Sequence, residues 1–256
     1  MDFLICKIEN GYYAFKLDNI QRVIESETVQ NVPNGSKYIE GLITYNKEPL
    51  EIVDMRKLLG FKSLTNELYE IFSILKQDHI DWIVALQDTI DNQTKFTKAI
   101  NPNECELGKW LNNFVSNNTD TRKLIENTKK HHLLFHNVSI DILNLNVEKQ
   151  KESIYKLFEK AKEYKKHILN DMNLLQSNAN ILANSMQKII IYKRNEHKIG
   201  LLIDNIDEII HLNDIDFKMM ECNTKNCEIV AISKVIDIKS KLTCVIDYIN
   251  IEELKK

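Results

Sequence analysis

The stretch FLICKIENGYYAFKL, residues 3–17, decides how the chain begins to fold. Residues 3–8 and 12–17 are runs of β-branched and aromatic side chains, which favour extended strands. Asn10 and Gly11 lie between these runs, and this dipeptide is a strong signal for a tight turn between antiparallel strands. We therefore predict a β-hairpin at the start of the chain.

Two further strands are predicted in the first 60 residues, at 38–45 and 49–53. A short segment, residues 18–24, follows the hairpin, and residues 54–60 close the stretch. A sheet needs several strands with a shared apolar face to be stable. This stretch is therefore too short to bury a full sheet alone.

The C-terminal part of the chain repeats this plan. Residues 189–203 again read as two short strands around a polar turn. Residues 204–210 then echo residues 18–24, and residues 245–249 echo residues 52–56, with offsets of 186 and 193 residues. Such self-similarity predicts two similar β subdomains, although two short echoes can also arise by chance.

An apolar helix face is predicted between the two β segments, because apolar residues recur there at spacings of three and four. Thr65 is the candidate N-cap of this helix. The face also carries a histidine, which the same spacing places in the core. Its members are Leu68, Phe72, Leu75, His79, Trp82 and Leu86.

More helical segments follow. One covers about residues 105–115, and another begins near Thr119. From Glu148 to Met186 the chain has neither Gly nor Pro, and apolar residues keep heptad spacing. A single helix over this stretch would be about 60 Å long. Two consecutive helices are the alternative, and the sequence leaves both open.

Histidine and cysteine residues on the helical segments suggest a metal site. His132 and His136 are four residues apart, so their rings project from one helix face and can bind one ion. His79 and Cys105 lie on neighbouring helices of a bundle, from which each can send one ligand inward. Three imidazoles and one thiolate complete a tetrahedral shell and favour Zn²⁺. Two plainer readings remain: His131 beside His132 indicates a region simply rich in histidine, and His79 can be a core residue bonded to a backbone carbonyl.

Three short motifs resemble the bacterial chemoreceptor zinc-binding (CZB) domain. His79 and Trp82 match its HxxW signature, the stretch from Cys105 to Trp110 matches CxxGxW, and His132 with His136 matches HxxxH. The resemblance covers about residues 65–166. It implies that His79, Cys105, His132 and His136 are the ligands of one zinc ion per chain.

The flanking segments resemble CheW, the coupling protein of bacterial chemotaxis. The similar stretches are residues 38–43, 49–56 and 200–204. The resemblance implies two small β-barrel subdomains, so the predicted fold class is α+β, a CheW-like pair of barrels with an inserted zinc-binding helical bundle. Where the family usually has Arg-Gly for receptor contact, this chain has Asn46 and Lys47. Receptor coupling is therefore the less expected of the family's interactions.

Composition excludes several other classes. The 256-residue chain has a net charge of −3, so no basic surplus favours nucleic acid. No apolar stretch is long enough to span a bilayer, and the N-terminus lacks the features of a signal peptide, which predicts a soluble cytoplasmic protein without membrane insertion. Five cysteines suit a reducing compartment. Cys222 and Cys227 have no second ligand pair nearby and are expected to be free thiols in a loop.

These observations predict three regions: residues 1–62 and 188–256 as the two parts of a CheW-like unit, and residues 63–187 as the zinc-binding bundle with its connecting helix. The predicted function is a signalling adaptor, not an enzyme, that senses zinc or oxidants and couples this signal to a CheA-type histidine kinase or a chemoreceptor tip. A purely structural zinc staple is one alternative. A zinc hydrolase is another, disfavoured because a thiolate in the fourth position leaves no open site for water. A homodimer through the helical bundle is left open.

Overall fold

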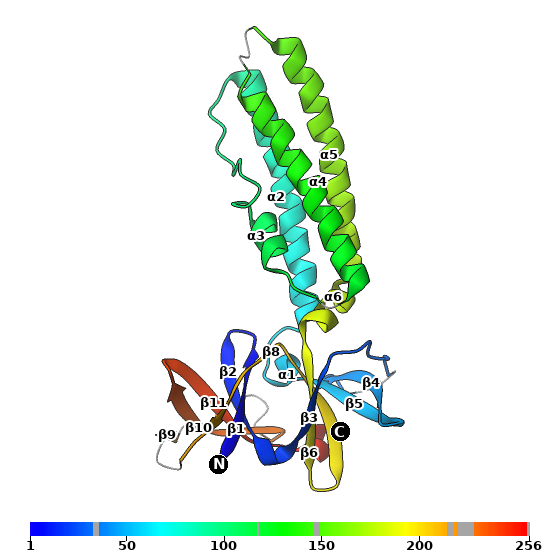
Figure 1. The fold of residues 1–256 in the computed structure, drawn as a ribbon, viewed down its shortest axis with the longest axis vertical. Coiled ribbons are helices and arrows are strands. Elements are labelled where there is room, and N and C mark those ends of the chain that lie inside the picture. Colours follow the sequence, from blue (N-terminus) through cyan, green and yellow to red (C-terminus); the bar gives the residue numbers. More distant parts are fainter. Residues whose placement is uncertain (33–35, 117, 146–148, 214–217, 220–227, 255–256) are drawn as a thin grey trace. The chain divides into compact units, whose positions relative to one another are not determined.

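The computed structural model divides into two compact units (Figure 1). The β unit comprises Met1–Leu64 and Ala183–Lys256, and the helical unit comprises Thr65–Leu182. The structure describes the whole chain except residues 33–35, 117, 146–148, 214–217, 220–227 and 255–256. Cys222, Cys227 and their predicted loop therefore lie outside the described residues.

The β unit contains two sheets, each built from strands of both sequence segments. In spatial order, the strands of the six-stranded sheet are β8 (Asn205–His211), β1 (Asp2–Ile8), β2 (Gly11–Lys16), β11 (Lys241–Ile249), β10 (Val230–Ile238) and β9 (Lys218–Met219). Those of the five-stranded sheet are β3 (Ile20–Glu25), β6 (Lys188–Arg194), β7 (His197–Ile203), β5 (Glu48–Asp54) and β4 (Ile39–Tyr45). The first segment alone therefore completes neither sheet.

The two halves of the unit have similar topology, and in each half every strand after the first hairpin joins the sheet that contains the other half's hairpin. Hairpin β1–β2 corresponds to hairpin β6–β7, and the strand after each hairpin crosses to the other sheet: β3 pairs with β6, and β8 pairs with β1. Strand β5 then pairs parallel to β7, as β11 does to β2. Short helices, α1 (Met55–Leu58) and α7 (Ile251–Leu254), end the two halves. The echoing segments 18–24 and 204–210 thus occupy equivalent places.

The prediction of two β-barrels is wrong in one respect, because the described strands form open sheets. Closing a barrel requires the two edge strands to bond to each other. In neither sheet does the described strand order close. Instead, one face of each sheet contributes to a shared apolar core, which includes Leu4 and Phe15 from one sheet and Val53 and Ile190 from the other.

The opposite sheet faces carry apolar clusters of their own. Phe3 and Ile5 belong to one cluster, and Ile189 and Ile191 to another. A strand covered on both faces is apolar along its length rather than alternating. This explains the uninterrupted apolar runs that made these strands recognisable in the sequence.

The first hairpin forms as predicted, but its turn is shifted by one residue. Ile8 pairs with Gly11, so Glu9 and Asn10 form the turn and Gly11 begins β2. The positive φ angle, 54°, falls on Glu9. The Glu9 N–H donates to Asp204 Oδ2 at 2.6 Å, so a contact distant in sequence helps to hold this conformation.

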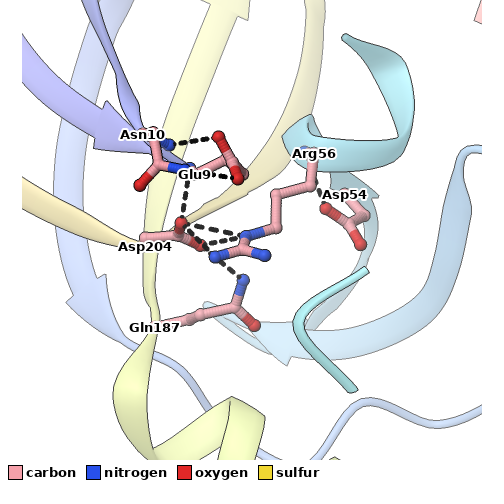
Figure 2. A network of polar contacts seen from close by, with 6 residues as sticks. All are labelled: Glu9, Asn10, Asp54, Arg56, Gln187 and Asp204. Atoms are coloured by element: carbon pink, nitrogen blue, oxygen red, sulfur yellow. Dashed lines mark hydrogen bonds and ion pairs between the residues drawn. The ribbon is translucent and has the colours of Figure 1, made fainter. Parts of the chain in front are cut away.

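A buried ion pair joins distant parts of the β unit (Figure 2). The Arg56 guanidinium is 6% exposed and binds the Asp204 carboxylate through two nitrogens, Nε at 2.8 Å from Oδ1 and Nη2 at 2.7 Å from Oδ2. Gln187 Nε2 donates to the same carboxylate at 3.2 Å. Arg56 lies shortly before the helical unit in the sequence, and Gln187 lies shortly after it. Asp204 therefore bonds to one residue on each side of the insertion.

The helical unit is built on helices α2 (Leu64–Asn92), α4 (Thr119–Leu143) and α5 (Lys151–Ser177), which run side by side in Figure 1. The predicted face of α2 is buried, with His79 3% exposed. The N-cap prediction is wrong: the helix begins at Leu64, so Thr65 lies in its first turn. Among the described residues, every helix is too short or too polar to cross a membrane.

In the described part of the stretch predicted as one or two helices, the structure forms two, α5 and α6. After α5, the short helix α6 (Ala179–Met186) begins, and Asn178 separates them. The Asn178 Nδ2 donates to the carbonyl oxygen of Leu174 at 2.7 Å. A side chain that bonds the preceding turn in this way competes with the helical backbone pattern, which is why the helix ends without Gly or Pro.

Candidate metal centre

The structure brings the four predicted ligands together in the helical unit. His79 lies on α2, Cys105 immediately precedes the short helix α3 (Glu106–Asn113), and His132 and His136 lie one turn apart on α4. One ligand atom from each residue lies within 4.8 Å of all the others. In the described part of the chain, this is the one cluster of three or more potential metal ligands.

The spacing of the ligand atoms suits a small cation. Cys105 Sγ lies 3.1 Å from His132 Nε2 and 3.9 Å from His79 Nε2. Ligand atoms around a tetrahedral zinc ion lie about 3.3–3.6 Å apart, given the usual Zn–N and Zn–S distances. These two distances bracket this range, and all four ligand atoms lie within 4.8 Å of one another, so they are near the separations that one ion requires.

Backbone carbonyls fix which nitrogen of two histidines faces the cluster. His79 Nδ1 donates to the Leu75 carbonyl oxygen at 2.8 Å, and His136 Nδ1 donates to that of Ile100 at 2.8 Å. A ring that donates from Nδ1 carries its free lone pair on Nε2. The reading of His79 as a core residue bonded to a carbonyl is thus compatible with metal binding, because the bond orients the ligand.

His136 gives the clearest sign that these residues suit a metal. Its Nε2 atom is buried and has no hydrogen-bond partner among the described residues. A buried polar atom without a partner destabilises a fold by about 1–3 kcal/mol. Coordination of a cation by this lone pair would remove that penalty.

Burial keeps the histidines neutral. It lowers the pKa of His132 to about 2 and that of His136 to about 4, and it lowers the pKa of His79 as well. The other histidines of the cluster add to these shifts, because two cations so close would repel each other. Neutral imidazoles are the form that binds metals.

The Cys105 thiol experiences opposing influences. Burial raises its pKa, the N–H groups of Gly108 and Leu107 lower it, and the carboxylates of Glu106 and Asp78 raise it further. The net direction is upward, so the thiol form is favoured without a cation. A bound zinc ion supplies the positive charge that makes such a thiol ionise.

Gly108 in the CxxGxW motif has a steric role that the sequence did not reveal. A Cβ atom at this position would lie 1.8 Å from the Pro102 carbonyl oxygen and 3.2 Å from Cε1 of His132. Only glycine lets α3 approach both groups. Nearby, Trp82 Nε1 donates to the Ala99 carbonyl oxygen at 2.9 Å and ties down the segment before α3.

The remaining candidates lie apart from the cluster. His131 Nδ1 contacts Asp171 Oδ2 at 2.6 Å, across from α4 to α5, so it is not a fifth ligand. Cys6 is buried and Cys244 is partly buried, both in the β unit. Ile100, whose carbonyl orients His136, was not predicted, because no sequence pattern marks a backbone acceptor.

Comparisons with known proteins show similarity to CheW proteins. The family model described as CheW-like domain matches residues 2–125, from β1 into α4. A curated relative, the chemotaxis protein CheW of Thermotoga maritima, is 25% identical over 129 residues, which are 48% of this chain and 82% of the relative. The solved structure of the scaffolding protein TtCheW from Thermoanaerobacter tengcongensis aligns with a TM-score of 0.44 and 10% identity, over 96% of this chain and 88% of that one. On the family match and the curated relative, the chain contains a CheW-like domain.

Proposed function

We propose that this protein is a chemotaxis signalling adaptor whose CheW-like unit binds a CheA-type histidine kinase or a chemoreceptor tip. In this proposal the helical unit is a CZB-type domain that holds one zinc ion through His79, Cys105, His132 and His136. The single observation that carries the proposal is the buried cluster of these four ligand atoms, with an unpartnered His136 Nε2, in a bundle inserted into a CheW-like chain.

The ligand set favours sensing or structural support over hydrolysis. Three imidazoles and a thiolate fill a tetrahedral shell, and a filled shell leaves no position for an activated water. A zinc-bound thiolate is also the form of cysteine that oxidants attack. Its sulfur can displace hydroxide from hydrogen peroxide, which breaks the O–O bond and gives a sulfenic acid. Oxidised Cys105 is a weaker ligand, so the cluster can report oxidants as well as zinc.

The chain gives the signal a covalent route to the β unit. Helix α5, packed against the ligand helix α4, is followed by α6, and α6 leads through Gln187 into β6. Gln187 binds Asp204, which also holds Arg56. A change in α4 and α5 can therefore act on the β unit through this segment.

The kinase is the more strongly supported partner. Asn46 and Lys47, at the positions where the CheW family usually has Arg-Gly for receptor contact, are exposed in the turn between β4 and β5. The chain thus lacks the guanidinium at this surface. We expect kinase binding to be retained and receptor binding to be weak.

Metal analysis tests the zinc site. Purified protein should contain one zinc per chain, and Cys105→Ala should lose it or bind it far more weakly. Cys222→Ala and Cys227→Ala are matched controls that should keep full metal content. A natively folded protein with no zinc, or zinc loss in either control, would refute the assignment.

Partner binding tests the adaptor. Calorimetric titration with the regulatory domain of a CheA-type kinase, and with a receptor tip, should be compared for zinc-loaded, chelated and Cys105→Ser protein. Because linkage is reciprocal, a partner that prefers one zinc state must also shift zinc affinity by the same factor. Equal affinities in all three states would reduce the metal to a structural staple, and failure to bind either partner would contradict the adaptor function.

A further inference from the structure

A cavity leads from solvent to the predicted metal ligands of the helical unit. Its volume is about 190 Å³, and its inner wall includes His79 and Cys105. Its outer wall includes the exposed side chains of Asp78, Glu104 and Glu106. The cavity therefore joins the protein surface to two of the four ligands.

The other two ligands are closed off from this side. His132 and His136 are 3% and 0% exposed, and neither lines the cavity. Cys105 is only partly buried. An ion that arrives through the cavity would meet Cys105 and His79 first and then the buried histidines.

The mouth of the cavity is negatively charged. Three carboxylates and one ammonium group, that of Lys98, line it. Glu106 is also paired with Lys109 at 2.6 Å, but this pair is largely exposed and therefore screened by solvent. A cleft lined with charge of one sign raises the local concentration of ions of the opposite sign and speeds their association.

We propose that this cavity is the entrance through which a divalent cation reaches the four-ligand cluster, and that Asp78, Glu104 and Glu106 attract the cation to it. The inference rests on the proposed metal site. It adds a kinetic role for three carboxylates that are not ligands of the final site. The same charges disfavour approach of anions to Cys105.

The first test measures metal uptake directly. Metal-free protein is mixed with Co²⁺ at low ionic strength, and the thiolate-to-cobalt absorption band is followed by stopped flow. The variant Asp78→Asn/Glu104→Gln/Glu106→Gln should bind Co²⁺ roughly threefold to tenfold more slowly than the unmodified protein. The difference should shrink at high salt, because screening shortens the range of the carboxylate field.

A charge-matched control distinguishes the effect of carboxylates at the cavity mouth from the effect of the net charge of the helical unit. Glu126 pairs with Lys129 three residues on, as Glu106 does with Lys109, and Asp141 is an exposed helical aspartate like Asp78. Glu159 likewise pairs with Lys162 on α5. Glu126→Gln/Asp141→Asn/Glu159→Gln, which removes three carboxylates as the mouth variant does, should leave the uptake rate unchanged. Equal uptake by the mouth variant and the unmodified protein, or equal slowing in the control, would overturn the proposal.

A second test needs no metal. Cys105 of metal-free protein is reacted with the dianionic disulfide 5,5′-dithiobis(2-nitrobenzoate) or the neutral 4,4′-dithiodipyridine, and Cys105→Ser identifies the relevant phase. The thiolate sulfur attacks the reagent disulfide, a mixed disulfide forms, and one reagent thiolate leaves. Removal of the Asp78 and Glu106 charges also increases the thiolate fraction of Cys105, which speeds the reaction with both reagents. The mouth variant should therefore gain several-fold more in rate with the dianion than with the neutral reagent, which corrects for the thiolate fraction. An equal gain with both reagents, or no gain with the dianion, would refute the acidic entrance, whereas failure of Co²⁺ to bind at all would refute the metal site itself.

Discussion

Asn46 and Lys47 form the two-residue turn between β4 and β5, and both have positive φ, 51° and 69°. This conformation suits hairpin turns, but it crowds the Cβ atom of any residue other than glycine. Asparagine tolerates it better than lysine does. Lys47 therefore strains the turn at a position where the family usually has glycine.

Replacing Lys47 with glycine should raise the free energy of unfolding by about 0.5–1 kcal/mol, because the relief of strain exceeds the added freedom of the unfolded chain. Urea unfolding measures the change. Lys7→Gly is the matched control, since Lys7 is an exposed lysine inside β1, where glycine should destabilise instead. A loss of stability in Lys47→Gly would contradict the argument.

Asp54 shows how burial makes a carboxyl group sensitive to pH. It is 1% exposed, and its Oδ1 accepts the Arg56 N–H at 2.8 Å, which caps α1. Burial, assisted by the nearby Glu40 carboxylate, raises the pKa of Asp54 to about 7. The folded state therefore holds this proton more tightly than the unfolded state does.

Between about pH 4 and pH 7, the contribution of Asp54 to stability should fall as pH rises, since the folded pKa lies above the unfolded one. Asp54→Asn keeps an oxygen acceptor and removes the titration. The stability of the unmodified protein relative to this variant should drop by about 1 kcal/mol per pH unit across the window. Urea unfolding of both proteins measures it, and parallel stability curves would exclude the shift.

Among the residues singled out in the sequence, those marked by a motif lie together in the structure. The spacing of His132 and His136 and the match to three signatures identified the residues that the structure brings together. The groups that orient them were not predictable. The Ile100 carbonyl and the close approach at Gly108 depend on how three segments pack, which no local pattern encodes.

At the scale of elements, the Arg56–Asp204 pair connects α1 to the residue between β7 and β8. Through Gln187, it also reaches the segment after α6. Removing one partner of a buried ion pair leaves an uncompensated charge. Asp204→Ala should therefore lower the free energy of unfolding by about 3–5 kcal/mol.

The double variant Arg56→Met/Asp204→Leu should recover most of that loss, because it leaves no buried charge. Thermal unfolding of the single and double variants provides the comparison. If the double variant is as unstable as Asp204→Ala, the hydrogen bonds of Asp204 to Glu9 and Gln187, rather than the charge on Arg56, hold these elements together.

The predicted strands and helices are present with shifted ends, but β9 and β10 were not predicted, and β3 and β8 were not predicted to be strands. Strands and helices follow from apolar periodicity over many residues, whereas an end depends on one or two contacts. Asn178 ends α5 through a side-chain bond to Leu174, and Asp204 holds the turn residue Glu9. Such contacts depend on tertiary structure or on one side-chain rotamer. The N-cap predicted at Thr65 and the turn predicted at Asn10 and Gly11 are therefore one or two residues away from their observed positions.

At the scale of the whole molecule, the sequence echo predicted a repeat but not the exchange of strands. The two halves give β3 and β8 to each other's sheets, and each of these strands pairs with a partner far away in sequence. The pattern of apolar and polar residues along a strand is the same in an open sheet and in a closed barrel. Pairing over such distances is set by packing, so the barrel prediction had no local evidence against it.

We expect the β unit to fold without the helical unit. Both ends of the insertion approach Asp204, through Arg56 on one side and Gln187 on the other. Residues 1–62 joined by a short Gly/Ser linker to residues 187–256 should give a soluble β protein with cooperative thermal unfolding by circular dichroism, since insertions are tolerated where chain ends lie close. An unfolded product would show that the helices belong to its core.

The exchange of β3 and β8 also sets an order of events during synthesis. β3 ends at Glu25, and its partner β6 begins only at Lys188. At the usual pace of translation, the first strands wait roughly 10–30 s on the ribosome before their partner exists. The helices, whose contacts are local, can form in that interval. Until translation is nearly complete, the nascent chain exposes strand edges whose partners do not yet exist, and such edges are templates for aggregation.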